Sequence, residues 1–412
     1  MNSIMLTSPA RETPGFTETH PKISTLRSKR VLIRIVLAWA TAGSSLGVIA
    51  SDTVFDFARA SHWPDSSEGV AVAVAGDDAV LVSGRSVVRF DVSNPDHPVS
   101  RGRLSLPNNP SESPNELSVS GNLLFVRYYV FDRDVLPPER GGFHVFDLTA
   151  RPDPLLVGSY APNHGLSALE VSGPYAYAGV YNDSGPGPMR EIGLRVLDVS
   201  NPAQPVPLGI CTNTGWVHGL AVSGNRVYVA GEEGLTVVDV SDPQHPILLG
   251  RFQTAAGAYD VAVSGSHVFV ATAGNRWELS AESGLEVIDV SNPAQPRRVG
   301  RYFTAGGVAR ITLHGSLAWI VAGVNPIWSA FGTPAGSDLQ VVDVSEPEHP
   351  RRVDKRNLPL GPASSVAVAN GRLFVPREGI YRIEETPAVS PTLRLQSGSP
   401  GDVPELWAQT PG

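Results

Sequence analysis

Two histidines and two charged residues stand at related places in the chain and are of the types that carry acid/base chemistry. His164 and His218 each come directly before Gly-Leu near the start of a predicted strand, and Asp260 and Arg310 stand at the start of two later strands. Imidazole and carboxylate groups exchange protons near neutral pH, and arginine can hold an anionic group beside them. With Glu116, they could form an acid/base or metal site of a hydrolase or lyase. Histidines in loops more often cap or pack the chain, so catalysis is the alternative hypothesis.

The sequence carries no recognised catalytic or metal-binding motif. HExxH, CxxCH, GxSxG, Walker and dinucleotide-binding signatures are absent, and no Cys or His pair has metal-ligand spacing. The stretch YNDSGPG at 181–187 offers oxygen ligands of the kind calcium takes, but it lacks the spacing of a complete calcium loop. We therefore expect no cofactor and no metal, with calcium left open, and we expect binding rather than catalysis.

A phrase ending in Asp-Val-Ser-Asn-Pro, or a close variant of it, recurs along the chain. Its aspartates are Asp91, Asp147, Asp198, Asp239, Asp289 and Asp343. Carboxylates on equivalent turns could ring a cation. An aspartate in this context also accepts hydrogen bonds from the next backbone amides, while the proline fixes the turn. Equivalent positions of a repeat lie far apart, so we expect these residues to build turns and not a ligand site.

The repeated unit predicts four strands. In one copy, LAV and VYVA flank the turn signal Ser-Gly-Asn and give strands a and b, GLTVVDV at 234–240 gives strand c, and ILLGRF at 247–252 gives strand d. Strand c is apolar on both faces, because Leu235 and Val237 alternate with Val238 and Val240, so both faces of each sheet should be buried. Seven copies of such a unit predict an all-β, seven-bladed β-propeller of four-stranded blades over residues 68–396.

The seventh copy leaves the closure of the ring open. It reads IYRIEETPAVSPTLRL at 380–395, and PTLRLQS at 391–397 is its expected strand d. An N-terminal strand is then not required for closure. The stretch TVFDFAR at 53–59, within a linker at 51–67, is an accessory strand that could still pair there.

The phrases GLTVVDVSDPQHPILLG and GLEVIDVSNPAQPRRVG resemble the LVIVD repeat, a family of propeller-forming repeats of exported and cell-surface proteins in bacteria and archaea. The resemblance covers about residues 68–395 and is most specific in the third to sixth copies. It implies a propeller fold and an extracytoplasmic location. The family has no general activity and no shared catalytic motif, so the resemblance assigns no role to any residue.

The two ends of the chain differ in character from the repeats. The basic stretch LRSKR at 26–30 precedes an apolar stretch at 31–50, which predicts a signal peptide over residues 1–50 cleaved after Ala50, or else an uncleaved N-terminal anchor. Residues 397–412 are expected to form a flexible tail. Residues 1–50 hold six of the 32 basic and two of the 40 acidic residues, so the remainder carries a net charge of −12. Such an acidic surface argues against nucleic-acid binding.

The copies differ most in the loops between strands b and c. Four of these b–c loops are long, at 127–142, 179–193, 272–284 and 323–338, and insertions on a repeat scaffold commonly collect on its binding face. The aromatic and arginine residues that we expect on this face are Tyr128, Tyr129, Tyr181, Trp216, Tyr259, Arg276, Trp277 and Trp328. The sequence thus predicts an exported, monomeric scaffold that binds a protein or glycan at the cell surface and meets a membrane only through an uncleaved N-terminal segment.

Overall fold

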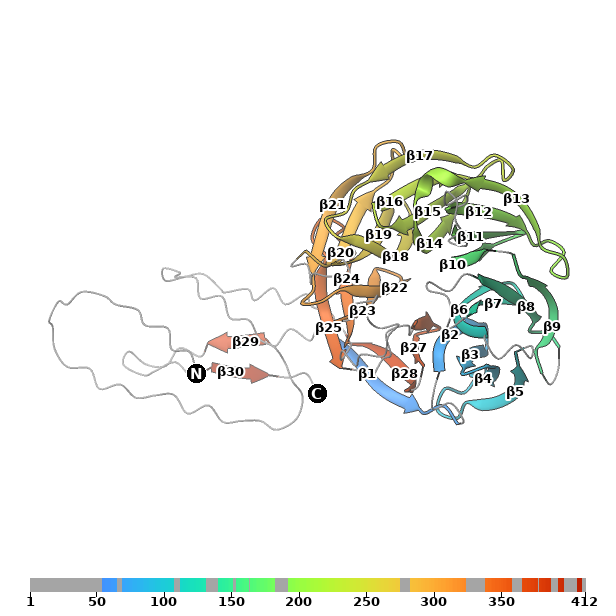
Figure 1. Ribbon diagram of the computed structural model, residues 1–412. Helices are drawn as coiled ribbons and strands as arrows, with labels where there is room; N and C mark the ends of the chain where they lie inside the picture. The colour runs from blue at the N-terminus through green and yellow to red at the C-terminus, as the bar shows by residue number, and fades with distance from the viewer. Residues whose placement is uncertain are drawn as a thin grey trace, which may run out of the picture. The chain divides into compact units, whose positions relative to one another are not determined.

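Seven four-stranded sheets form a ring in the computed structural model (Figure 1). The structure describes residues 54–64, 69–106, 112–130, 140–150, 153–162, 164–181, 192–274, 282–323, 338–357, 365–376, 378–386, 392–395 and 406–409, all of them in the compact unit 50–412. Every sheet is antiparallel. In six of the seven blades, the innermost strand is the first of the four along the chain. The predicted seven-bladed, all-β propeller is therefore confirmed.

The blades follow the chain in order. Blade 1 consists of β2 (Gly69–Ala75), β3 (Asp78–Ser83), β4 (Ser86–Asp91) and β5 (Val99–Ser105). Blade 2 consists of β6 (Glu112–Ser120), β7 (Leu123–Val130), β8 (Arg140–Asp147) and β9 (Leu155–Tyr160). Blade 3 consists of β10 (Gly165–Ser172), β11 (Tyr175–Tyr181), β12 (Gly193–Asp198) and β13 (Val206–Cys211). Blade 4 consists of β14 (Val217–Ser223), β15 (Arg226–Gly231), β16 (Gly234–Asp239) and β17 (Ile247–Phe252).

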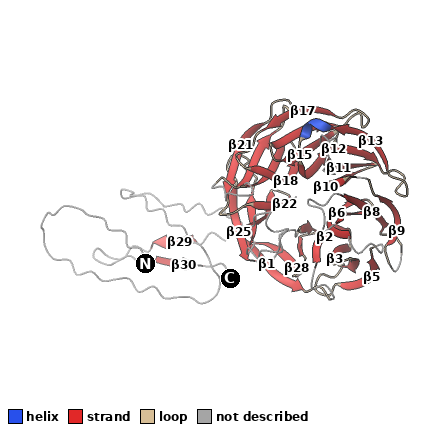
Figure 2. Cartoon of the chain, in the orientation of Figure 1, coloured by secondary structure: helices blue, strands red, loops and turns tan. Residues whose placement is uncertain are grey.

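The second half of the ring repeats this arrangement until its last strand. Blade 5 consists of β18 (Gly257–Ser264), β19 (His267–Ala273), β20 (Gly284–Asp289) and β21 (Arg297–Phe303). Blade 6 consists of β22 (Val308–His314), β23 (Leu317–Ala322), β24 (Asp338–Asp343) and β25 (Arg351–Asn357). Blade 7 consists of β26 (Ala367–Ala369), β27 (Arg372–Val375), β28 (Gly379–Thr386) and β1 (Val54–Ser61). One 3-10 turn, η1 (Thr212–Thr214), is the helical element of the described residues (Figure 2).

The ring closes through its N-terminal strand. β1 pairs antiparallel with β28 from Val54 opposite Thr386 to Ser61 opposite Ile380, and so supplies strand d of blade 7. The expectation that 391–397 would fill this place is wrong, because β29 (Thr392–Leu395) pairs instead with β30 (Leu406–Gln409). The accessory strand considered at 53–59 is the closing strand. It joins the first and last parts of the chain in one sheet, so the ring does not depend on contacts between neighbouring blades alone.

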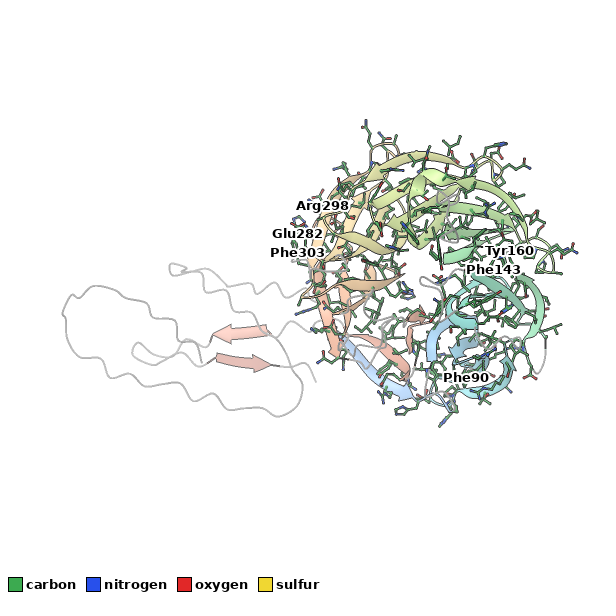
Figure 3. All side chains as sticks on the ribbon, viewed as in Figure 1. Phe90, Phe143, Tyr160, Glu282, Arg298 and Phe303 are labelled. Atoms are coloured by element: carbon green, nitrogen blue, oxygen red, sulfur yellow. The ribbon has the colours of Figure 1, made fainter. Side chains whose placement is uncertain are left out.

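Apolar side chains fill the spaces between successive blades. Strands b and c are buried on both faces, as the sequence predicts; β23, for example, is buried along its whole length. Between blades 7 and 1, Trp63 packs against Phe90 and Phe374, with ring centroids 5.0 and 6.4 Å away, and its indole N–H donates to the Val375 carbonyl. Within blade 2, the rings of Phe143 and Tyr160 are 5.5 Å apart (Figure 3). Each such side chain contributes about 1.5–3 kcal/mol when fully buried.

The repeated aspartates form turns, as predicted. In every one of the six copies, Oδ1 of the aspartate accepts the backbone N–H of the residue two positions later, from Asp91 with Ser93 (2.9 Å) to Asp343 with Ser345 (3.0 Å). The turn also contacts the preceding blade. Gly158, Gly209, Gly250 and Gly300, each in a strand d, lie against the Pro-containing turns of the next blades, where a Cβ atom would meet backbone atoms. The turn that the recurrent phrase forms therefore packs one blade against the preceding one.

The described residues include no helix that is long and apolar enough to cross a membrane.

Candidate functional site

The innermost strands share an irregularity at one end. In blades 1 to 6 the pairing of strand a with strand b shifts by one residue. The bulged residues are Val70, Asn115, Ser167, His218, Tyr259 and Ala309. A bulge redirects side chains and increases the local twist. These bulges lie at the rim that carries the b–c loops, which we call the long-loop rim; the Asp-Asn-Pro turns form the opposite, turn rim.

Side chains beside the bulges hold neighbouring blades together. Glu116 Oε2 accepts the N–H of Leu169 in the next blade (3.1 Å), and Asp260 Oδ2 accepts the N–H of Ile311 in the same way (3.0 Å). Ser365 repeats the contact in blade 7, where its Oγ accepts the N–H of Val72 (3.3 Å). Glu116 and Asp260 occupy the same position of strand a, and Ser365 occupies the equivalent position of the repeat, two residues before β26. Each of them links the inner strand of its blade to that of the next blade.

Two aromatic pairs lie at the long-loop rim between blades 3 and 5. The rings of His218 and Tyr259 are stacked, with centroids 5.0 Å apart and planes 10° apart. Those of Tyr181 and Trp216 are 5.3 Å apart. Tyr181 covers Gly165, where a Cβ atom would collide with its ring. Each pair joins two successive blades, and Trp216, His218 and Tyr259 remain partly exposed. We call these four residues the aromatic arc.

The histidine of this arc is held in place as a neutral ring. His218 Nδ1 lies 3.0 Å from the carbonyl oxygen of Ala258. A carbonyl accepts only, so Nδ1 carries the proton. Burial lowers the pKa of His218, although this hydrogen bond acts in the opposite direction. Burial also raises the pKa of Tyr259, and the charge of Glu232 adds to the rise. Both rings are therefore neutral near pH 7.

Two carboxyl groups of the inner strands have raised pKa values, because their surroundings do not fully offset the cost of burying a negative charge. Burial raises the pKa of Glu170 to about 8, and the charges of Glu116 and Asp260 add to this rise. Burial also raises the pKa of Asp260 to about 6, while the charge of Arg310 opposes it. Glu116, in the blade next to that of Glu170, accepts a hydrogen bond from Arg127 Nε (2.5 Å). Glu170 therefore carries a proton at neutral pH.

The residues of the catalytic alternative have structural partners. Asp260 accepts the N–H of Val261 and of Ile311 with its two oxygens, and His218 bridges blades 4 and 5. Within the described ranges, no hydrogen bond joins His218, Asp260 and Arg310 to one another. His164 is partly buried, with Nδ1 3.4 Å from the Gly165 carbonyl oxygen. Among all the residues that the structure describes, no group of three or more His, Cys, Asp or Glu side chains is placed to hold a metal ion.

The residues expected on the binding face divide into three sets. Trp216 and Tyr259 are partly exposed in the aromatic arc, and Tyr129 is partly exposed at the end of β7. Tyr128 and Tyr181 are buried, at 4% and 7% exposure, so they support the rim more than they present a surface. Arg276, Trp277 and Trp328, like most of YNDSGPG, lie outside the described residues.

The sequence interpretation missed Glu170. Its position in strand a is occupied in the other copies by Ala73, Ser118, Ala221, Ala262, Thr312 and Ala367. A single charged residue in a column of small ones is the signal that could have identified it. Glu112 and His144 were missed as well, since neither matches a motif.

Comparison with known proteins identifies the repeat but no activity. No curated protein matches the chain. Among solved structures, the crystal structure of the computationally designed Ika8 protein is similar over 82% of this chain and 100% of the designed one, with 9% identity and a TM-score of 0.49. The LVIVD repeat model matches residues 167–213, 214–254 and 256–304, which are close to the limits of blades 3, 4 and 5. This chain therefore carries three LVIVD repeats within its seven-bladed propeller.

Proposed function

We propose that the protein is an exported, monomeric, non-enzymatic scaffold that binds a protein, glycan or other envelope component through its long-loop rim. The aromatic arc carries this proposal. Aromatic side chains that are fixed against neighbouring blades and partly exposed lose little conformational entropy on binding, and they supply large contact areas. Trp216 and Tyr259 meet this description.

β1 begins at the turn rim, opposite the rim that carries the aromatic arc. β1 begins at Val54, opposite Thr386 at the end of β28. Strand c of each blade runs from the long-loop rim to the turn rim, so the chain enters the ring at the turn rim.

Binding measurements on paired variants test the proposal. Protein beginning at residue 51 would be applied to a glycan array and crosslinked to envelope extract of the native cells. Trp216→Ala and Tyr259→Ala should each weaken the observed binding by about tenfold or more. Gln244→Ala and His245→Ala, at exposed positions of the turn rim, should leave it unchanged. Equal effects of the two pairs, with thermal stability retained, would contradict the proposal.

A further inference from the structure

Three side chains of blade 2 form a hydrogen-bonded row that does not include the aromatic arc. Ser159 Oγ lies 2.8 Å from Nδ1 of His144, and Nε2 of the same ring lies 3.2 Å from Oε2 of Glu112. Ser159 is exposed on the outer strand β9, whereas His144 and Glu112 are 4% and 8% exposed. The row therefore leads from a solvent-accessible hydroxyl to a buried carboxyl group.

The direction of each hydrogen bond follows from the donors available. An ionised carboxylate only accepts, so Nε2 of His144 carries the proton and donates it to Glu112. Nδ1 is then left with its lone pair and accepts the hydrogen bond of the Ser159 hydroxyl. The ring is held in this orientation by Tyr128, which stacks on it at 4.6 Å and 19°. Burial is the largest influence on His144 and lowers its pKa, while the hydrogen bond and the charge of Glu112 act in the opposite direction. The ring is therefore neutral at pH 7, and Nδ1 keeps its lone pair.

We propose that Ser159 is an activated nucleophile that attacks carboxylic esters, with His144 as its general base and Glu112 as the positioning residue. A nucleophile in hydrogen-bond contact with a base that a third group orients is the arrangement that activates serine, and it is recognised by geometry and not by sequence order. This site shares no residue with the aromatic arc and does not depend on the function proposed for it.

The reaction is acyl transfer to and from the serine. Ser159 Oγ bonds to the ester carbonyl carbon while its proton passes to Nδ1 of His144. The ester C–O bond then breaks, and the leaving alkoxide takes that proton and departs as the alcohol. A water molecule, deprotonated by His144, releases the acyl group as a carboxylic acid and restores the serine. β9 is the outer strand of its sheet and pairs with β8 alone, and stabilisation of the oxyanion would fall to backbone N–H donors near the serine.

The equivalent position of strand c has a different role in other blades. Glu286, in blade 5, accepts the N–H of Ala255 (3.0 Å), and Gln340, in blade 6, accepts the hydroxyl of Tyr302 (2.6 Å). Both contacts join parts of the fold, and neither includes an imidazole that could act as a base. Blade 2 instead places an imidazole between a carboxylate and an exposed hydroxyl.

A fluorophosphonate probe tests the nucleophile directly. We expect labelling at Ser159, located by peptide mass mapping, at least about tenfold faster than at Ser105, an exposed serine on the outer strand of blade 1. Ser159→Ala should remove the label and the hydrolysis of p-nitrophenyl acetate that exceeds background. Glu112→Gln should slow labelling and shift the pH at which it is half-maximal. Labelling of Ser159 no faster than of Ser105, in protein with unchanged thermal stability, would overturn the proposal.

A thiol replacement gives a second measurement that does not require turnover. The one native cysteine, Cys211, is buried, so an introduced thiol can be followed with iodoacetamide. Ser159→Cys should be alkylated at a lower pH than Ser105→Cys, because His144 accepts the thiol proton. Identical pH profiles for the two variants would also overturn the proposal.

Discussion

Gly158 of blade 2 lies directly against Pro202 of blade 3, and no Cβ atom fits between them. The same contact recurs between Gly250 of blade 4 and Pro293 of blade 5. In both cases the obstacle is backbone, which cannot rotate away as a side chain can. Glycine is therefore required here by the approach of the next blade and not by an unusual backbone conformation.

Alanine at these glycines should destabilise the propeller. Gly250→Ala would push the turn at Pro293 outward and separate blades 4 and 5, and overpacking of this kind costs about 1–3 kcal/mol or more. Gly257→Ala is the matched control, since the nearest atom to its added Cβ is 3.4 Å away. Chemical denaturation should show a lower free energy of unfolding for the first variant only. Equal stability of the two variants would contradict the conclusion that the close contact between Gly250 and Pro293 stabilises the packing of the two blades.

Acid should weaken the turns of the recurrent phrase. Hydrogen bonds from Ser200 lower the pKa of Asp198, and bonds from the equivalent serine or threonine are the first cause of the lowered pKa at Asp91, Asp147, Asp239 and Asp289. A folded pKa below the unfolded value gives stability that is present above the unfolded pKa, about 4, and is lost as pH falls through the folded one. We expect the melting temperature to fall steeply below pH 4.

Substitution by asparagine separates the charge from the turn. Asp198→Asn keeps an oxygen that can accept the Ser200 N–H but removes the titration, so its melting temperature should depend less on pH between about 4 and 2. Asp77→Asn, on an exposed hairpin, controls for the loss of one negative charge. If both variants keep the full pH dependence, the turn aspartates are not its source.

Local patterns were sufficient to predict the blades and their turns. The copies repeat their hydrophobic alternation and their Asp-Ser-Pro spacing, and both features act within a few residues. Closure was different, because PTLRLQS and TVFDFAR have equally good strand patterns. The choice between them depends on which strand reaches β28 in three dimensions. The row of Ser159, His144 and Glu112 was hidden for a similar reason, since pairing across a blade brings these distant residues together.

The protonated Glu170 should make stability fall as pH rises. Its pKa is about 8 in the folded protein against 4.5 when exposed, so the folded state binds the proton more tightly. Its contribution is complete below pH 4.5 and is lost as pH rises through 8. Glu170→Gln should therefore raise the free energy of unfolding at pH 9, by on the order of a few kcal/mol, and have little effect at pH 4.5. Glu348→Gln, exposed on the turn rim, is the control, and a gain independent of pH would contradict this explanation.

Removal of the closing strand should open the ring. Protein beginning at residue 51 retains β1 and should unfold at the temperature of the full chain. Protein beginning at residue 65 lacks both β1 and Trp63 and leaves β28 as an unpaired edge, so it should unfold at a lower temperature and self-associate. A synthetic peptide of residues 51–64 should restore stability by strand addition. The same peptide with Trp63→Ala should be less effective, because loss of a buried tryptophan costs about 3–5 kcal/mol. Equal melting temperatures for the two truncated proteins would show that β1 is not required for closure.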